Sequence, residues 1–237
     1  MSSLQSVASA GEVGDFERWW QREGVWVEAA NQRRGGESGV QRLTPLVSGG
    51  PALYCKRQTG HLFYSLLHPF GRPTALRELQ AYRAYAQAGV NVPRLVYGAT
   101  RKHQGQWQAL LVTEELAGFV SLDEWYLKHA RDTDSQVKAA LLEQVAVMLA
   151  RLHRARWQHG CCYPKHVFVR ITPQTDAQPL IETAMLDLEK SRRRWRTRDA
   201  SFRDLRQLRR HRGQIPERDL DYLQQIHHQA LKGDGVK

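Results

Sequence analysis

The sequence predicts an α+β fold in two lobes: a β-rich N-lobe with five antiparallel strands and one helix, then a reduced, mainly helical C-lobe. Short apolar runs separated by Gly, Pro and polar residues fill the first half of the chain. The second half opens with a long amphipathic helix. The change falls at Ala117–Ser121, which we expect to be the linker. The expected boundaries are a flexible N-terminus over residues 1–14, an N-lobe over 15–116 and a C-lobe over 117–237.

The strands of the N-lobe are predicted from five short runs bounded by turn residues. These runs are Val25–Glu28, Val40–Leu43, Ala52–Gln58, Arg94–Thr100 and Gln106–Leu116. A helix is expected between the third and the fourth run, because apolar residues recur there at helical spacing between Pro73 and Gly89. The N-lobe is therefore five strands with one helix inserted after the third.

The C-lobe begins with the clearest helical pattern, over Ser135–His153, in which one stripe contains a single polar residue, Gln144. A compact polar loop, HGCCYPKH, follows at residues 159–166. Two apolar runs after it predict a strand pair, and a last helical pattern follows Pro216. The two runs are Val167–Ile171 and Leu180–Leu188.

Charge is concentrated in one segment. The chain has 35 lysines and arginines against 24 acidic residues, a net charge of +11. Lys190–Arg212 alone contains eleven of the basic residues and only two aspartates. Such a segment favours an anionic partner: an anionic glycan, the anionic face of a membrane or a nucleic acid. The alternative is a solvated basic helix that only keeps the protein in solution.

Composition narrows the class of protein. With 41% hydrophobic and 25% charged residues the chain is globular, and no apolar run approaches the roughly 18 residues of a membrane span. The three cysteines, two of them adjacent, do not form a secreted disulfide framework. We therefore expect a protein of the cytoplasm, with peripheral contact at the cytoplasmic face of the inner membrane as an extension of that expectation.

Three residues appear in the order that phosphoryl transfer from ATP requires. Lys56 lies in the middle of the third predicted strand, Glu78 follows on the predicted helix, and Asp187 ends the second apolar run of the C-lobe. In such enzymes a lysine grips the phosphates, an acidic residue holds the lysine, and an aspartate binds the metal ion. An aspartate at a strand end is either a metal ligand or a helix cap.

Five blocks, in order, resemble the lipopolysaccharide kinase (Kdo/WaaP) family, and within it the InaA-like members. They are RRGGESGV, LYCKRQ, HPFGRPTALRE, HGCCYPKH and LDLEKSRR, and the resemblance spans about residues 15–230. It implies a protein-kinase-like fold and ATP-dependent phosphorylation of a sugar hydroxyl in the lipopolysaccharide core. It also implies ATP and Mg²⁺ as cofactors, with Mn²⁺ as an alternative ion.

The resemblance assigns roles to residues of this chain. Asp187 and His166 correspond to metal ligands, and Arg33–Gly39 corresponds to the loop over the nucleotide, although GGESG differs from the usual G-x-G-x-x-G. The expected nucleotide-binding residues are Arg33, Gly35, Gly36, Gly39, Lys56, Glu78 and Glu115.

One position departs from the pattern of kinases. Against the catalytic loop H-R-D-x-x-x-x-N, the chain has Cys161 where the catalytic aspartate belongs. The expected catalytic set is Cys161, His159 and Asp187, in which His159 either braces the loop or transfers a proton. Loss of a general base costs about 10²–10⁴ in rate, so a slow kinase and a catalytically inactive kinase-like module are both open.

Three further alternatives concern the loop and the basic segment. His153, His159, Cys161, Cys162 and His166 are thiol and imidazole groups that zinc accepts, at a spacing that matches no recognised zinc motif. Cys161 and His159 also form a conceivable nucleophile pair. Nucleic-acid binding through Lys190–Arg212 has thin support, because only two aromatic residues interrupt the charge and no motif accompanies it.

Overall fold

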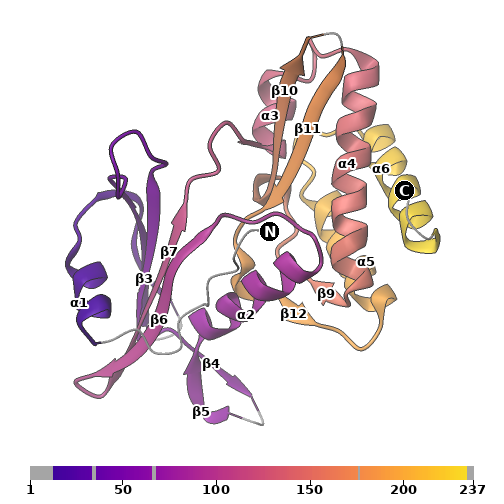
Figure 1. The fold of residues 1–237 in the computed structure, drawn as a ribbon. Coiled ribbons are helices and arrows are strands. Elements are labelled where there is room, and N and C mark those ends of the chain that lie inside the picture. Colours follow the sequence, from indigo (N-terminus) through magenta and orange to yellow (C-terminus); the bar gives the residue numbers. More distant parts are fainter. Residues whose placement is uncertain (1–12, 34–35, 66–67, 176, 234–237) are drawn as a thin grey trace. The chain divides into compact units, whose positions relative to one another are not determined.

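The structure is a computed structural model that describes residues 13–33, 36–65, 68–175 and 177–233 (Figure 1). The chain forms two compact units. The first holds the described residues up to Gln80 together with Pro93–Ala117, and the second holds Ala81–Val92 and the described residues from Gly118 onward. Most of the expected flexible N-terminus lies outside the described residues.

The first unit is built on a five-stranded antiparallel sheet, as the sequence predicted, and the order of its strands is β1-β2-β3-β7-β6. Each observed strand overlaps one predicted run, and helix α2 (Thr74–Gln87) follows the third strand of the sheet in the sequence. The strands are β1 (Val25–Arg33), β2 (Gly36–Leu43), β3 (Leu53–Thr59), β6 (Leu95–His103) and β7 (Gln106–Glu114).

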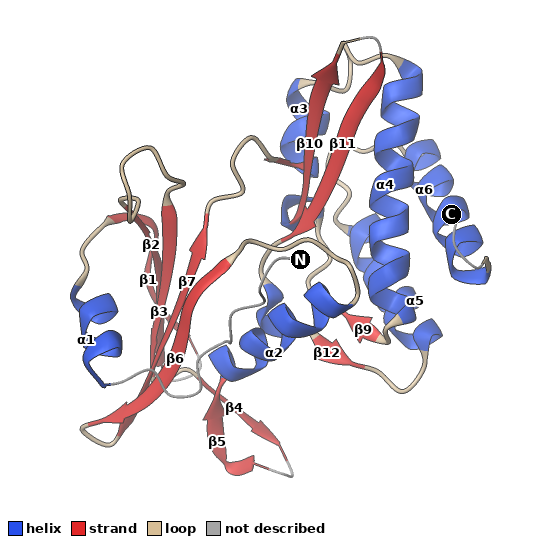
Figure 2. Ribbon diagram, viewed as in Figure 1, coloured by secondary structure: helices blue, strands red, loops and turns tan. Residues whose placement is uncertain are grey.

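One face of this sheet is covered by helix α1 (Val13–Gln21), which the sequence analysis did not predict (Figure 2). Phe16 is 3% exposed and joins a core cluster with Leu43, Leu53 and Val112. A hairpin of β4 (Leu62–Ser65) and β5 (His68–Pro73) was also not predicted. Both elements are too short for their periodicity to stand out in the sequence.

The second unit contains the predicted long helix as α4 (Ser135–Arg154). The carboxylate of Asp134 caps it by accepting the N–H groups of Gln136 and Val137 at 2.7 and 3.3 Å. The predicted stripe is buried from Leu141 to Leu152, and its one polar member, Gln144, is exposed. The buried stripe therefore joins α4 to the core of the second unit.

Further elements complete the second unit. The predicted strand pair is β10 (Val167–Gln174) with β11 (Ala177–Met185), and it forms a three-stranded sheet with β8 (Val120–Ser121). Helix α6 (Glu217–Lys232) is the predicted last helix. The elements that the sequence did not predict are α3 (Leu122–Lys128), β9 (Trp157–Gln158), β12 (Arg192–Arg193) and α5 (Thr197–Arg210). Among the described residues, no helix is long and apolar enough to cross a membrane.

Candidate functional site

In the first unit, the structure brings Lys56 and Glu78 together. The Nζ atom of Lys56 lies 2.9 Å from Oε2 of Glu78, and their side chains are 18% and 4% exposed. An ion pair removed from water to this degree needs good geometry and further hydrogen-bond partners to offset the loss of solvation. The ion pair of Lys56 and Glu78 is therefore shielded from water, unlike the ion pairs on the protein surface.

Alternation along the strand explains how Lys56 reaches this position. Leu53 and Cys55 point into the core cluster under α1, so Lys56 points to the opposite face, where it lies across from Leu111 of β7. The start of α2 is fastened to the sheet by Thr74, whose buried hydroxyl donates to the side-chain oxygen of Gln58 at 3.1 Å. Glu78 lies one turn further along the same helix.

The segment Arg33–Gly39 lies in the β1–β2 hairpin, where Arg33 pairs with Gly36, and Gly35 falls outside the described residues. A Cβ atom on Gly36 would lie 2.4 Å from the backbone of Gly60, and one on Gly39 would lie 2.6 Å from the ring of Trp26. The close approach of the backbone thus requires glycine at position 36, whereas a side chain at position 39 would first displace the ring of Trp26.

Glu115 follows β7 and is tied to its own unit. Its backbone N–H donates to the carbonyl of Ala52 at 2.8 Å. Its carboxylate lies 3.7 Å from the guanidinium of Arg42 and accepts the hydroxyl of Tyr54 at 3.4 Å. A nucleotide at this position would therefore meet a carboxylate that already has two partners.

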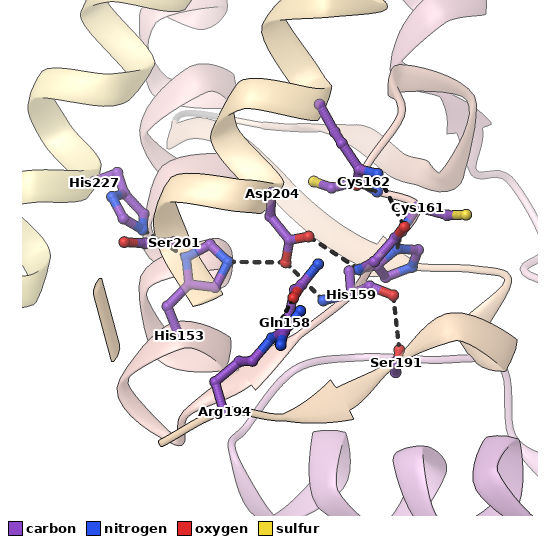
Figure 3. Close-up of polar contacts among 12 residues, drawn as sticks. His153, Gln158, His159, Cys161, Cys162, Ser191, Arg194, Ser201, Asp204 and His227 are labelled. Atoms are coloured by element: carbon purple, nitrogen blue, oxygen red, sulfur yellow. Dashed lines mark hydrogen bonds and ion pairs between the residues drawn. The ribbon is translucent and has the colours of Figure 1, made fainter. Parts of the chain in front are cut away.

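In the second unit, Asp204 of α5 holds the polar loop at residues 159–166 (Figure 3). Its Oδ2 atom accepts the N–H of His159 at 2.6 Å, and its Oδ1 atom accepts the N–H of Gly160 at 3.0 Å. The Nε2 atom of His153, on α4, lies 3.2 Å from Oδ2. Because Asp204 is fully buried, these donors replace water around its carboxylate.

The side chain of Gln207 and the backbone conformation of Gly160 also fix this loop. Gln207, one turn after Asp204, accepts the N–H of Cys162 at 3.2 Å and donates to the carbonyl of Gly160 at 3.0 Å. Gly160 has a φ of 81°, and a Cβ atom there would lie 2.6 Å from the carbonyl oxygen of Lys190. The loop therefore requires glycine at this position.

His159 is a neutral imidazole with both nitrogens occupied. Nδ1 accepts the N–H of Cys161 at 3.2 Å, so the ring proton is on Nε2, which donates to the carbonyl of Leu186 at 2.9 Å. Burial lowers the pKa of His159 below its usual value. This geometry favours the brace over the proton carrier, because neither nitrogen is free to face a substrate.

His166 and Asp187 lie side by side. The Nδ1 atom of His166 donates to the carbonyl of Cys161 at 2.8 Å, and its Nε2 atom lies 3.6 Å from Oδ2 of Asp187. An imidazole that donates its other nitrogen to a backbone carbonyl is the usual arrangement of a metal-binding histidine. A cation shared by the two groups would stabilise this pair of electron-rich atoms.

Asp187 has an unusual backbone conformation. Its φ and ψ are 60° and 67°, in the left-handed region, which is uncommon for residues other than glycine. It precedes a short 3-10 helix, and its side chain makes no capping hydrogen bond there. The helix-cap interpretation of Asp187 therefore has no support, and the strained residue is a candidate for function.

The alternatives for the loop cysteines do not fit the structure. Cys162 is fully buried, and burial raises the pKa of its thiol far above the usual value. The described residues contain no group of three or more side chains able to hold a metal ion, so the zinc hypothesis is wrong for this part of the chain. Nδ1 of His159 binds the backbone of Cys161, so His159 is not set up to activate the thiol.

Sequence reasoning missed the residues that organise the loop. Asp204 lies in the basic segment, where a lone acid looks like part of a solvated surface. The position of Asp204 relative to Ala200 and Leu208 could have revealed its role. These three residues are spaced four apart and form one buried face of α5. A carboxylate on the buried face of a basic helix indicates a partner inside the protein.

The five-stranded antiparallel sheet with its helix and the mainly helical second unit define a protein-kinase-like fold. The model of the lipopolysaccharide kinase (Kdo/WaaP) family matches residues 17–227, and the chain belongs to this family. It is 43% identical to "Protein InaA" of Escherichia coli K12 over 218 residues, which cover 92% of this chain and 97% of that protein. The family and the fold predicted from the sequence are thus confirmed.

Two kinds of more distant relative were found. The lipopolysaccharide core heptose(I) kinase WaaP of Pseudomonas aeruginosa is 30% identical over 136 residues, and its counterpart in Escherichia coli K12 is 26% identical over 131 residues. These alignments cover about half of this chain and 49% of each relative. A solved structure, "WaaP in complex with acyl carrier protein", has a TM-score of 0.67 and 24% identity over 91% of this chain and 82% of its own, which shows the shared fold.

The role of Asp204 can be tested by removing its charge. We expect Asp204→Asn to lower the free energy of unfolding by about 3 kcal/mol, because the amide cannot accept hydrogen bonds from all the buried donors. Asp199→Asn, an exposed change on the same helix, is the matched control and should alter it by less than about 0.5 kcal/mol. Urea denaturation followed by circular dichroism measures both. Equal effects would mean that Asp204 does not organise the loop.

His227 makes stability depend on pH. Its Nε2 atom lies 2.8 Å from Nδ1 of His153, and burial with the neighbouring His153 and His228 lowers its pKa to about 3. The unfolded state thus binds more protons below about pH 6.5, and stability falls as the pH drops from there. We expect His227→Gln to remove about 2 kcal/mol of the loss between pH 7.5 and pH 5. Urea titrations at both pH values measure it, and an unchanged loss would contradict the prediction.

Proposed function

We propose that this protein is an ATP-dependent kinase that transfers a phosphoryl group to a sugar hydroxyl of the lipopolysaccharide core. The observation that carries the proposal is the buried ion pair of Lys56 and Glu78, at 2.9 Å. It is the arrangement by which kinases hold a lysine against the phosphates of ATP. Membership of the family supports the reaction class, and two relatives are named as lipopolysaccharide core heptose(I) kinases.

The nucleotide-binding side is assigned to the first unit. Lys56 holds phosphate oxygens, and Glu78 keeps the ammonium group of Lys56 in place. The hairpin with Arg33, Gly35, Gly36 and Gly39 covers the nucleotide, and Glu115 completes the set. The tight approach of neighbouring backbone to Gly36 supports a rigid hairpin at this position.

Asp187 and His166 are the proposed ligands of a divalent cation. The donor set fits such an ion, because one carboxylate with few other protein ligands leaves coordination positions for phosphate oxygens and water. Mg²⁺ prefers oxygen donors, and an imidazole donor also suits Mn²⁺. When bound, the ion would neutralise the charge that develops on the phosphates. Asp187 presents its carboxylate, and Cys161 orients His166 through its backbone carbonyl.

Catalysis in this proposal depends on positioning and charge rather than on a general base. Phosphoryl transfer requires little proton chemistry from the protein. Because Cys161 replaces the aspartate that would accept the hydroxyl proton, we expect the reaction to be slower than that of kinases with an intact loop, by about 10²–10⁴. His159 positions the loop and does not touch the substrate.

A second candidate is a catalytically inactive kinase-like module that binds nucleotide or a partner. The observation that favours it is the burial of Cys161, whose 3% exposure leaves its thiol little access to an acceptor sugar. The two candidate functions differ in one expected result: the kinase turns over substrate in the unaltered protein, and the inactive module does not.

We place the protein in the cytoplasm, where ATP is available. All three cysteines are free and buried, as in proteins of a reducing compartment. The excess of basic residues suits peripheral contact with the anionic inner face of the membrane, at about 1 kcal/mol for each basic residue near that surface.

Binding of ATP tests the nucleotide site. ATP at 100 times its dissociation constant, with Mg²⁺ or Mn²⁺, should stabilise the protein by about 2.7 kcal/mol, seen as a rise in Tm. Lys56→Ala and Asp187→Asn should abolish this rise. Lys102→Ala, an exposed lysine of the same sheet, and Asp199→Asn are matched controls that should keep it. No rise at millimolar ATP in the unaltered protein would contradict the proposal.

Restoring the base tests catalysis. We expect slow phosphoryl transfer from radiolabelled ATP to lipopolysaccharide core oligosaccharide by the unaltered protein, and a gain of at least about tenfold in Cys161→Asp. The matched control is Cys161→Asn. The asparagine side chain has nearly the same shape as that of aspartate but cannot accept the hydroxyl proton, so this variant should show no such gain. Transfer by Cys161→Asp alone, with none in the unaltered protein, would favour the inactive module instead.

A further inference from the structure

The arginines of helix α5 and of the residues on either side of it fall into two groups. Arg209 lies 2.6 Å from Asp221 of α6, and Arg212, just after α5, lies 3.1 Å from Glu217. These two charges are neutralised within the protein. The other group has no acidic partner within ion-pair distance among the described residues; it includes Arg192 of β12 and Arg198, Arg203, Arg206 and Arg210 of α5.

Four of these unpaired arginines lie around one groove of about 660 Å³: Arg192, Arg203, Arg206 and Arg210. Asp199, Arg203, Arg206 and Arg210 follow one another at helical spacing and share one face of α5, and β9 and β12 close the other side. The lining is Gln158, Gly160, Arg192, Arg194, Asp199, Phe202, Arg203, Arg206, Gln207 and Arg210. Five guanidinium groups therefore surround this groove with one carboxylate among them.

The groove has more positive than negative charge in its lining. Burial and the charges of Arg192 and Arg203 lower the pKa of Arg194. The Nε atom of Arg194 donates to the side-chain oxygen of Gln158 at 2.6 Å, so this guanidinium is held in place by a neutral group (Figure 3). Five like charges that share a single lining carboxylate, that of Asp199, repel each other, and a bound anion would relieve that repulsion.

We propose that this groove binds the phosphate or carboxylate groups of an anionic glycan. The inference rests on the proposed function and assigns the residues that would hold the anionic groups of its substrate. The planar guanidinium group binds both phosphate and carboxylate through two parallel hydrogen bonds, which suits a glycan that carries several such groups. The volume of the groove is that of a small-molecule site.

Two lining residues favour a glycan over a nucleic acid or a membrane. Phe202 is 63% exposed, so its ring is free to stack on the C–H face of a sugar. The carboxylate of Asp199 accepts hydrogen bonds from sugar hydroxyls, whereas it would repel a chain of phosphates. A bilayer presents a broad surface, and a concave site with a carboxylate in it does not match such a surface.

The groove is also connected to the loop that holds the candidate catalytic residues. Gly160 belongs to both, and Gln207 in the lining binds Gly160 and Cys162 of the loop. A glycan anchored by its anionic groups in the groove thus lies against the loop at Gly160. Anchoring of this kind fixes a substrate without using the reacting hydroxyl.

Binding measured without ATP tests the inference. The probe is deacylated lipopolysaccharide core oligosaccharide, titrated into the full chain by calorimetry at low salt. We expect saturable binding of one oligosaccharide per chain. Arg203→Gln/Arg206→Gln/Arg210→Gln should weaken it at least tenfold, whereas Arg193→Gln/Arg196→Gln/Arg198→Gln should change it less than twofold. The control removes the same charge from exposed arginines of the same segment that do not line the groove.

Other probes identify what is recognised. Dephosphorylated and carboxyl-reduced forms of the oligosaccharide should bind more weakly, by at least tenfold for the form that lacks the recognised group. Equal loss in the two triple variants, equal binding of all three oligosaccharides, or tighter binding of phosphatidylglycerol vesicles or single-stranded RNA would overturn the inference. Lys56→Ala lies outside the groove and should bind oligosaccharide normally. A missing ATP response beside intact glycan binding would therefore count against the proposed function alone.

Discussion

A buried carboxylate, that of Asp204, determines how the second unit is assembled. A charge without water is tolerated only where several donors converge on it. Here the donors come from the backbone of His159 and Gly160 and from the ring of His153 on α4. One carboxylate therefore joins a helix, a loop and a second helix, and the geometry of the loop follows from satisfying a single buried charge.

Different sides of helix α5 make different kinds of contact. The face with Ala200, Asp204 and Leu208 is buried and organises the loop. The side with Arg209 contacts the acidic residues of α6. The face with Arg203 and Arg206 keeps its charge unpaired and lines the groove. The strong positive charge of the segment is thus partly structural, and only the unpaired part is available to a ligand.

The success of sequence reasoning followed the strength of the local pattern. The five strands and helices α2, α4 and α6 were predicted, because alternation or helical spacing runs through each of them. The meeting of Lys56 and Glu78 was predicted from order along the chain, since a strand and the next helix limit where their side chains lie. Helix α5 was missed because its buried face consists of Ala200, Asp204 and Leu208, and small or charged residues do not produce an apolar stripe.

The same reasoning explains why Cys161 can be tolerated in an otherwise ordered loop. Residue 161 is bound through its backbone: its N–H donates to His159, and its carbonyl accepts from His166. Neither bond involves the thiol, so the loop orients the imidazole of His166 toward Asp187 whichever side chain stands at position 161. In the proposed function, metal binding and proton transfer are therefore separable. Loss of the base would remove one contribution to the rate of the proposed transfer, and it would leave in place the positioning and electrostatic stabilisation on which phosphoryl transfer mainly depends.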